Sequence, residues 1–434
     1  MDKMADVLGR VGAWCGQNKY LSAIKNAFQN FMPLTIAGAI GVLWCNVLVN
    51  DQTGLGLFFK PIMALDFLNP AFQAVNFCTI SCITVGITLG IAQEIGVWNM
   101  GAERAGYIPG LVGLAAWLSV TNTSHMVEGA KEAFTGIAGN ELGATGLFTG
   151  MIIGVLSVEL FCFFEKQDAL KIKMPEQVPP GVARAFEVLV PATITLIITA
   201  CIGSACYNLT GLYLNDVIKN GIQGPLGAVG ATIPGVMIIY LVIMLFWLVG
   251  IHGNNMLSAV KEALFTPLAL ENVEKFNKGE KPTNIINMYA LQMWGEFGGS
   301  GVTIGLVIAI MIFGKREDNK AIASLSLVPG LFNINETVTF GIPMVLNPIL
   351  GIPFVVAPLI TIIIGYVLTV IGFCPVACLT VPWTTPPIVF GFLATGANVM
   401  GAVTQAILIV VSTVIYVPFL IAYEKYQNKQ AAEA

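Results

Sequence analysis

The sequence predicts an all-α polytopic membrane protein, and composition, long apolar runs and clustered basic residues all support this fold class. Of the 434 residues, 56% are hydrophobic and only 11% are charged, whereas soluble globular proteins typically carry about 25% charged residues. The mean hydropathy is +0.79. The net charge of −4 is small, and the short basic clusters give no footprint for nucleic-acid binding.

The apolar runs define the expected membrane spans, because about 20 mostly apolar helical residues cross a bilayer. Clear runs lie at 31–50, 71–93, 146–164, 186–206, 231–251, 352–373 and 401–423, and shorter or glycine-interrupted runs lie at 107–121 and 301–314. Residues 1–30 alternate basic and apolar side chains, which predicts an amphipathic helix on the cytoplasmic surface; a solvated leader is the alternative.

The positions of Lys and Arg predict the orientation of the chain. Basic residues gather at the N-terminus, in 165–184 and in the C-terminal tail, so both termini of this multi-pass protein are predicted to be cytoplasmic. Region 282–314 is basic on both flanks. Either this region makes two half-crossings, or one of the two basic clusters breaks the rule that basic residues face the cytoplasm.

Three segments of the second half are interrupted by glycine or proline, namely 294–301, 328–348 and 374–387. At membrane depth, such backbone is tolerated where it packs in protein or lines a wet cavity. We therefore expect a transmembrane scaffold half at 1–210 and a substrate-binding half at 211–434.

Glu336 is the first candidate for chemistry. It lies in NINETVTFG, between short polar side chains, within otherwise apolar sequence. An acid at the membrane centre costs about 2.5–3.5 kcal/mol, so a functional role is the default hypothesis. Alternatively, Glu336 caps a half-helix that begins after Asn335, where the helix dipole favours negative charge.

His252 is the second candidate, in the segment GIHGNNML. The flanking glycines let a ligand approach the backbone, and Asn254 and Asn255 add amide donors and acceptors. His125, in a polar connection, is expected to be solvated or to stabilise a loop. Glu296 fits a functional role and an interfacial position equally well, whereas ion pairing or orientation is expected for Glu159, Arg184 and Glu187.

Aromatic rings complete the candidate site, since a sugar needs a flat apolar platform beside hydrogen-bonding groups. Trp247 and Trp383 are the candidates, with membrane-interface anchoring as the alternative. The candidate substrate-binding residues are Asn255, Trp247, Trp383, Asn335, Ser300, Gly299, Asn254 and Gly143. The nine cysteines include no CxxC pair, and neither a metal site nor a cofactor is predicted.

Several motifs, in this order along the chain, resemble the EIIC membrane component of the bacterial phosphoenolpyruvate-dependent sugar phosphotransferase system, within its lactose/cellobiose/diacetylchitobiose family. They are MPLTIAGAI, VPPGVARAFEVLVP, GIHGNNML, TPLALEN, FGGSGVTIGL, NINETVTFGIPMVLNPILGIPF and PWTTP. Each motif is weak alone, but together they extend over nearly the whole chain.

The resemblance implies a protein of the bacterial inner (plasma) membrane with ten transmembrane helices and re-entrant hairpins. It also implies a homodimer formed through the N-terminal half and a β-linked disaccharide bound in the C-terminal half. It also implies phosphorylation of the sugar 6-hydroxyl by a phosphocysteine of an EIIB partner. The family's paired His and Glu map onto His252 and Glu336, with Glu336 as the base. None of the cysteines lies in a soluble segment long enough to be an EIIB domain, so the donor is expected on a separate protein.

Two other classes of membrane protein remain open. An ion-coupled sugar symporter usually spreads several acids or bases along an ion path, whereas the best candidates here concentrate at two positions. A passive channel or a purely structural membrane protein is the other alternative. Whether the chain counts as an enzyme is open too, because the phosphoryl donor would belong to its partner.

Overall fold

The computed structural model describes residues 10, 14, 17–51, 55–125, 134–175, 177–342 and 344–433. These residues are mostly helical, and their one sheet is a two-stranded antiparallel hairpin of β1 (Ser124–His125) and β2 (Phe134–Thr135). The chain forms two compact units. One comprises the described residues of 17–38 and 75–228, here called the scaffold unit; the other comprises the described residues of 1–16, 39–74 and 229–434, here called the pocket unit.

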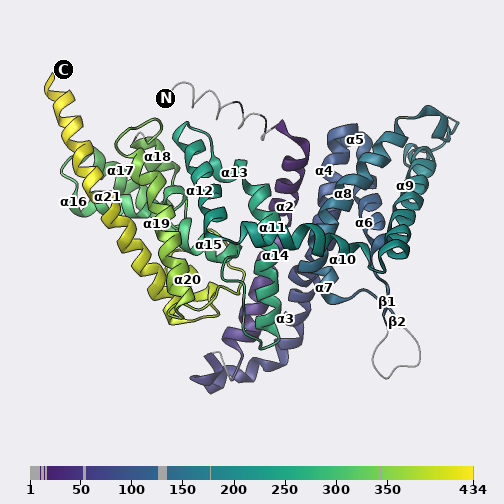
Figure 1. The fold of residues 1–434 in the computed structure, drawn as a ribbon, viewed down its shortest axis with the longest axis horizontal. Helices are drawn as coiled ribbons and strands as arrows, with labels where there is room; N and C mark the ends of the chain where they lie inside the picture. Colours follow the sequence, from purple (N-terminus) through teal and green to yellow (C-terminus); the bar gives the residue numbers. More distant parts are fainter. Residues whose placement is uncertain are drawn as a thin grey trace. The chain divides into compact units, whose positions relative to one another are not determined.

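The longer helices of the scaffold unit overlap the predicted apolar runs, and its short helices lie between them (Figure 1). They are the first part of α2 (Lys19–Leu43), α4 (Ile83–Met100), α5 (Ala102–Ala105), α6 (Ile108–Val120), α7 (Gly139–Leu142), α8 (Ala144–Glu165), α9 (Pro180–Thr210), α10 (Leu214–Ile218) and most of α11 (Gly224–Gly230). Short 3-10 or π segments occur at Phe77–Ser81, Asp168–Leu170 and Lys219–Gln223.

Small residues allow α4, α6 and α8 to pack closely. A Cβ added at Gly150 would lie 2.2 Å from Thr88 Oγ1, and one added at Gly113 would lie 2.3 Å from the Ala92 Cβ. Close backbone approach through small residues is a common way for membrane helices to associate, because lipid offers no hydrophobic driving force between them. Trp117, fully buried, belongs to a hydrophobic cluster with Ala116, Val120 and Ile153 in the same unit.

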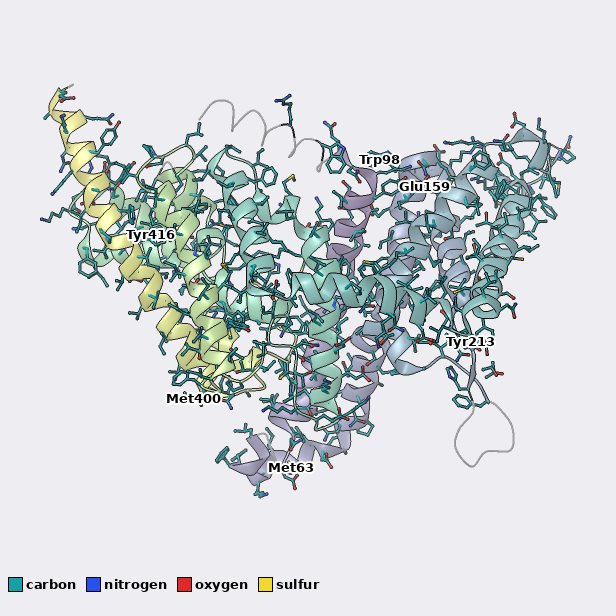
Figure 2. The ribbon with its side chains drawn as sticks, in the orientation of Figure 1. Met63, Trp98, Glu159, Tyr213, Met400 and Tyr416 are labelled. Atoms are coloured by element: carbon teal, nitrogen blue, oxygen red, sulfur yellow. The ribbon has the colours of Figure 1, made fainter. Side chains whose placement is uncertain are left out.

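The pocket unit contains more broken helices. They are α12 (Ile233–Leu248), α13 (Gly253–Met256), α14 (Ser258–Asn277), α15 (Met288–Gly295), α16 (Ile304–Phe313), α17 (Glu317–Leu331), α18 (Glu336–Gly341), α19 (Gly351–Val370), α20 (Val389–Ala394) and α21 (Val399–Glu433). This unit also holds most of α3 (Asn69–Asn76) and short segments at Trp44–Leu48, Leu55–Leu57, Lys60–Leu68 and Ser300–Val302. Tyr416 of α21 (Figure 2) donates a hydrogen bond of 2.8 Å to the Gly301 carbonyl.

The described residues contain five helices long and apolar enough to cross a membrane, or up to seven if two bent pairs each count as one span. Met288–Val302 and Ile304–Phe313 form one of these pairs, and the two helices meet at a bend of 59°. Such a bend fits the predicted broken or re-entrant element within 282–314. The expected total of ten crossings, the orientation of the termini and the functional division at 210 stay predictions.

The N-terminal helix α2 continues into the first predicted span. Lys19–Leu43 is one continuous helix within the candidate span Lys19–Leu48. Most of residues 1–18 lie outside the described part, and the amphipathic surface helix at 1–30 stays a prediction. Other helices satisfy polar groups in the first turns of α2. Lys19 Nζ lies 2.6 Å from Glu159 Oε1, and Asn26 donates to Glu94 over 2.9 Å.

Candidate functional site

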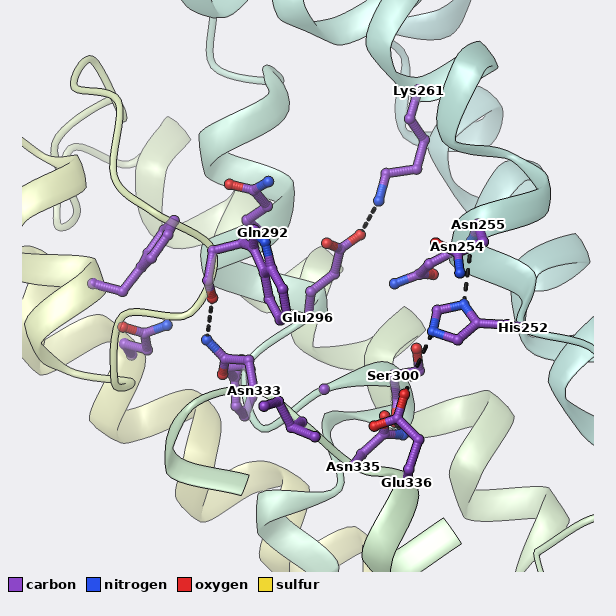
Figure 3. Close-up of a pocket in the computed structure, with 16 residues that line it drawn as sticks. His252, Asn254, Asn255, Lys261, Gln292, Glu296, Ser300, Asn333, Asn335 and Glu336 are labelled. Carbon is purple, nitrogen blue, oxygen red and sulfur yellow. Dashed lines mark hydrogen bonds and ion pairs between the residues drawn. The ribbon is translucent and has the colours of Figure 1, made fainter. Parts of the chain in front are cut away.

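A polar pocket in the pocket unit gathers residues from the interrupted segments (Figure 3). Its volume is about 530 Å³, within the range of about 300–1,000 Å³ that is typical of small-molecule sites. Its lining residues are His252, Asn254, Asn255, Lys261, Gln292, Glu296, Phe297, Gly299, Ser300, Asn333, Ile334, Asn335, Glu336, Trp383, Phe390 and Gln405.

The backbone around His252 fixes the orientation and the tautomer of its imidazole. His252 is the N-cap of α13, and its Nδ1 accepts a hydrogen bond from the Asn255 N–H over 3.3 Å. A neutral imidazole that accepts at Nδ1 carries its proton on Nε2. Burial lowers the pKa of His252, although the Glu336 carboxylate opposes that effect. The neutral ring therefore presents an Nε2–H donor to the pocket.

Glu336 lies opposite this donor, as the first residue of α18. His252 Nε2 and Glu336 Oε1 are 3.8 Å apart, longer than a hydrogen bond. Glu336 Oε2 is buried without a hydrogen-bond partner in the described structure. The site therefore offers a hydroxyl one donor at His252 and one acceptor at Glu336, and the first turn of α18 remains compatible with a dipole contribution.

Asn333, in the interrupted segment 328–348, is hydrogen-bonded to both of the other interrupted segments. Its Oδ1 accepts from the Gly298 N–H over 2.6 Å, and its Nδ2 donates to the carbonyls of Trp383 and Thr385 over 2.5 and 3.0 Å. Asn333 has a φ of 62°, a left-handed conformation that Asn tolerates better than most residues. The Asn333 side chain thus holds two segments against NINETVTFG: the glycine-rich turn at 294–301 and the loop at 374–387, here called the Trp383 loop.

Asn335 has a similar structural role and is itself buried. Its Nδ2 donates to the Ser300 carbonyl over 2.9 Å and to Thr339 Oγ1 over 3.1 Å. Gly299 has a φ of 87°, and a Cβ there would lie 2.6 Å from the Asn335 Cβ. Asn335, Gly299 and Ser300 all line the pocket, but the amide hydrogens of Asn335 are already used within the protein.

The structure separates the two candidate tryptophans. Trp383 lines the pocket and is 44% exposed, so its ring is available to a ligand. Trp247 is 2% exposed and is not among the pocket-lining residues. The centroid of its ring lies 4.4 Å from the ring centroid of His252 and 6.4 Å from that of Phe354. The expected platform at Trp247 is thus corrected to a support behind the imidazole, because Trp247 packs into the core of the unit.

Of the remaining predicted binding residues, two line the pocket and one does not. Asn254 and Asn255 line the pocket, and Asn254 Oδ1 is buried without a hydrogen-bond partner in the described structure. Gly143 is not brought into the pocket: it belongs to the scaffold unit, where its carbonyl accepts a 2.7 Å hydrogen bond from Thr84. Gly143 therefore stabilises the start of α8.

The charged residues assigned to structural roles have ion partners within the scaffold unit. Glu159 pairs with Lys19, and Arg184 pairs with both Glu187 and the buried Glu165. His125 lies in β1, where its ring contacts Phe134 and its Nε2 lies 3.2 Å from the Asn122 carbonyl. These contacts confirm the expected ion pairing and loop stabilisation.

Sequence reasoning missed several pocket residues, above all Lys261 and Gln292, and left Glu296 undecided. Lys261 pairs with Glu296, and the Tyr240 hydroxyl donates to the same carboxylate over 2.7 Å. The sequence signal for Lys261 was a charged pair, KE, inside an apolar stretch after GIHGNNML. Within the described residues, no group of three or more His, Cys, Asp or Glu side chains is placed to hold a metal ion.

Known proteins resemble this chain over nearly its full length. The family model described as "Phosphotransferase system, EIIC" matches residues 25–358. An oligo-beta-mannoside-specific EIIC component of Bacillus subtilis is 33% identical, covering 98% of this chain and 94% of that protein. A cellobiose-specific EIIC component of Lactococcus lactis is 30% identical, with 98% of each covered.

A solved structure shows the same fold. The crystal structure of the transporter ChbC, the IIC component from the N,N'-diacetylchitobiose-specific phosphotransferase system, matches with a TM-score of 0.88 at 29% identity, and 98% of each chain is covered. The motifs, the helical membrane architecture and these matches agree. This chain belongs to the EIIC family of the phosphotransferase system, whose members are polytopic membrane proteins that transport sugars.

Proposed function

We propose that this protein is a sugar permease that binds a β-linked disaccharide and presents its 6-hydroxyl to a phosphocysteine on a separate EIIB protein. The observation that carries the proposal is the approach of His252 Nε2 to within 3.8 Å of Glu336 Oε1 at a polar pocket. The matched relatives specific for cellobiose, oligo-beta-mannoside and N,N'-diacetylchitobiose support this class of substrate.

The chemistry needs positioning and a base, which are the main protein contributions to phosphoryl transfer. The sugar 6-oxygen attacks phosphorus in line, the new oxygen–phosphorus bond forms, and the sulfur–phosphorus bond breaks. Glu336 takes the hydroxyl proton, and the cysteine thiolate remains on EIIB. The Nε2–H of His252 donates to the attacking oxygen and orients it.

Trp383 provides the apolar surface in this proposal, because its exposed ring lines the pocket. Sugar rings present C–H faces that pack on aromatic rings. A homodimer formed through the N-terminal half, cytoplasmic termini and docking of EIIB on the cytoplasmic face are further parts of the proposal. The basic residues in 165–184 favour encounter with an acidic or phosphorylated partner.

Uptake into sealed vesicles tests the function against the symporter alternative. Vesicles containing this protein receive radiolabelled cellobiose, lactose or N,N'-diacetylchitobiose, with and without phosphorylated EIIB on the cytoplasmic side. We expect sugar 6-phosphate to accumulate only with phosphorylated EIIB. Accumulation of free sugar driven by an ion gradient alone would contradict the proposal.

A further inference from the structure

The pocket contains a second ion pair, which the phosphoryl-transfer proposal does not use. Lys261 Nζ contacts Glu296 Oε1, and the side chains are only 7% and 16% exposed. The Tyr240 hydroxyl donates to the same oxygen over 2.7 Å. In Figure 3, the Lys261 ammonium is directed to the Glu296 carboxylate, whereas His252 faces Glu336.

The pair determines the charge that a ligand meets. The titratable residues that line the pocket in the described structure are His252, Lys261, Glu296 and Glu336. His252 is neutral in the arrangement described above, and Lys261 and Glu296 compensate each other. Glu336 is left as the uncompensated carboxylate. The charges of Lys261, Glu296 and Glu336 all act on His252, so they share one electrostatic environment.

This charge distribution distinguishes the substrate from the product of the proposed reaction. A neutral disaccharide does not interact with the pocket through net charge. A phosphate ester carries about −1.5 to −2 charges near pH 7 and is repelled by Glu336. Lysine is a common phosphate ligand, but Glu296 holds this pocket lysine in another contact, and the Tyr240 hydroxyl in turn holds the Glu296 carboxylate.

We propose that Glu296 is a specificity-determining residue, which holds Lys261 away from bound ligands so that the pocket accepts the neutral sugar and rejects its 6-phosphate. The inference rests on the proposed function and extends it to product release. A phosphorylated sugar that is bound weakly leaves the site, whereas a free lysine beside the transferred phosphate would retain it and cause product inhibition.

If the Lys261–Glu296 pair served only to join α14 to the end of α15, a different result would be expected. Loss of such a link would weaken the binding of the neutral and the phosphorylated sugar together. The ratio of the two affinities therefore separates the roles. Glu262 provides the matched control, because it is next to Lys261 in the chain, contacts Thr266 and is not among the pocket-lining residues.

The test measures binding of a disaccharide and its 6-phosphate to the purified full-length protein, by competition with labelled sugar. Cellobiose, lactose and N,N'-diacetylchitobiose are screened first, and the one that binds is used with its 6-phosphate. We expect Glu296→Gln to raise the affinity for the phosphosugar about ten- to a hundredfold relative to the neutral sugar, as one new charge-assisted hydrogen bond would. Adding Lys261→Met should abolish that gain, and Glu262→Gln should not produce it.

An unchanged affinity ratio in Glu296→Gln, or an equal gain in Glu262→Gln, would overturn the inference. If Glu296→Gln does not fold, Lys261→Met alone tests the same idea. It leaves two uncompensated carboxylates and should weaken phosphosugar binding more than sugar binding; equal effects on both ligands would overturn the inference. If the unmodified protein binds none of the three sugars, the proposed substrate class itself fails.

Discussion

The scaffold unit and the pocket unit bury their backbone in different ways. In the scaffold unit, α4, α6 and α8 are continuous helices that satisfy their own hydrogen bonds and approach through small residues such as Gly113 and Gly150. In the pocket unit, the helices stop at 295, 331 and 341, and the side chains of Asn333 and Asn335 bind the backbone between them.

The difference shows where polar chemistry can exist inside a membrane protein. A continuous helix leaves unpaired backbone groups only at its two ends, so its interior packs well but offers a ligand few hydrogen bonds. Broken helices free N–H and C=O groups, which need partners in protein or a wet cavity. The same asparagines line one pocket together with His252, Glu336 and Trp383, and Asn333 also holds the backbone at Trp383.

The largest expected effect comes from removing the proposed base. Glu336→Gln keeps the shape of the side chain but cannot accept the hydroxyl proton as a carboxylate does. We expect the phosphorylation rate to fall by about 10²- to 10⁴-fold, the usual contribution of general base catalysis, while sugar binding is partly kept. The measurement is the rate of sugar phosphorylation by phosphorylated EIIB. A rate equal to that of the unmodified protein would remove Glu336 as the base.

The next largest effect should come from Asn333→Gly, which keeps the left-handed backbone but removes the amide. Three backbone groups lose their partner, and each such loss costs about 1–3 kcal/mol when the group stays buried. We expect sugar affinity to fall at least tenfold, about 1.4 kcal/mol, because the glycine-rich turn and the loop that carries Trp383 both lose their anchor. The matched control is Leu346→Gly, also at positive φ, 55°. A similar loss in both variants would indicate a general backbone effect.

A change in the scaffold unit should affect stability and leave the site intact. Gly150→Ala forces a methyl group against Thr88, and overpacking of this kind typically costs about 1–3 kcal/mol. The unfolding temperature in detergent should fall, whereas the sugar affinity of the folded fraction should not change. Gly139→Ala is the control, because a Cβ there meets nothing within 4 Å. Loss of affinity without loss of stability would contradict the assigned roles of the two units.

The smallest effect is expected for Trp383→Ala. Aromatic contacts contribute about 0.5–1.5 kcal/mol beyond the area they bury, so sugar affinity should fall about two- to tenfold. Equilibrium binding of the labelled sugar measures the change. Trp98→Ala serves as the control, since Trp98 is 57% exposed and lies on α4 in the scaffold unit. An unchanged affinity in Trp383→Ala would assign this ring to membrane anchoring.

The sequence by itself determined the class of fold and the positions of most helices. Apolar runs such as 146–164 and 352–373 appear as α8 and α19, because a bilayer requires long apolar helices whatever their neighbours are. Glycine and proline correctly predicted the broken segments, because both residues weaken a helix whatever its neighbours are. Pro343 lies outside the described residues. Glu336 and His252 stood out because isolated polar groups in apolar sequence are costly.

The tertiary structure alone decided which polar residues act together. No local pattern shows that Lys261 reaches Glu296, or that Asn333 holds the Trp383 loop, since these partners are 35 and 50 residues apart in the chain. Burial likewise separated Trp247, which supports the imidazole, from Trp383, which faces the pocket. The local sequence determines where a helix breaks and which backbone groups lose their hydrogen bonds. Only the packing of the chain determines which side chain then pairs with those groups.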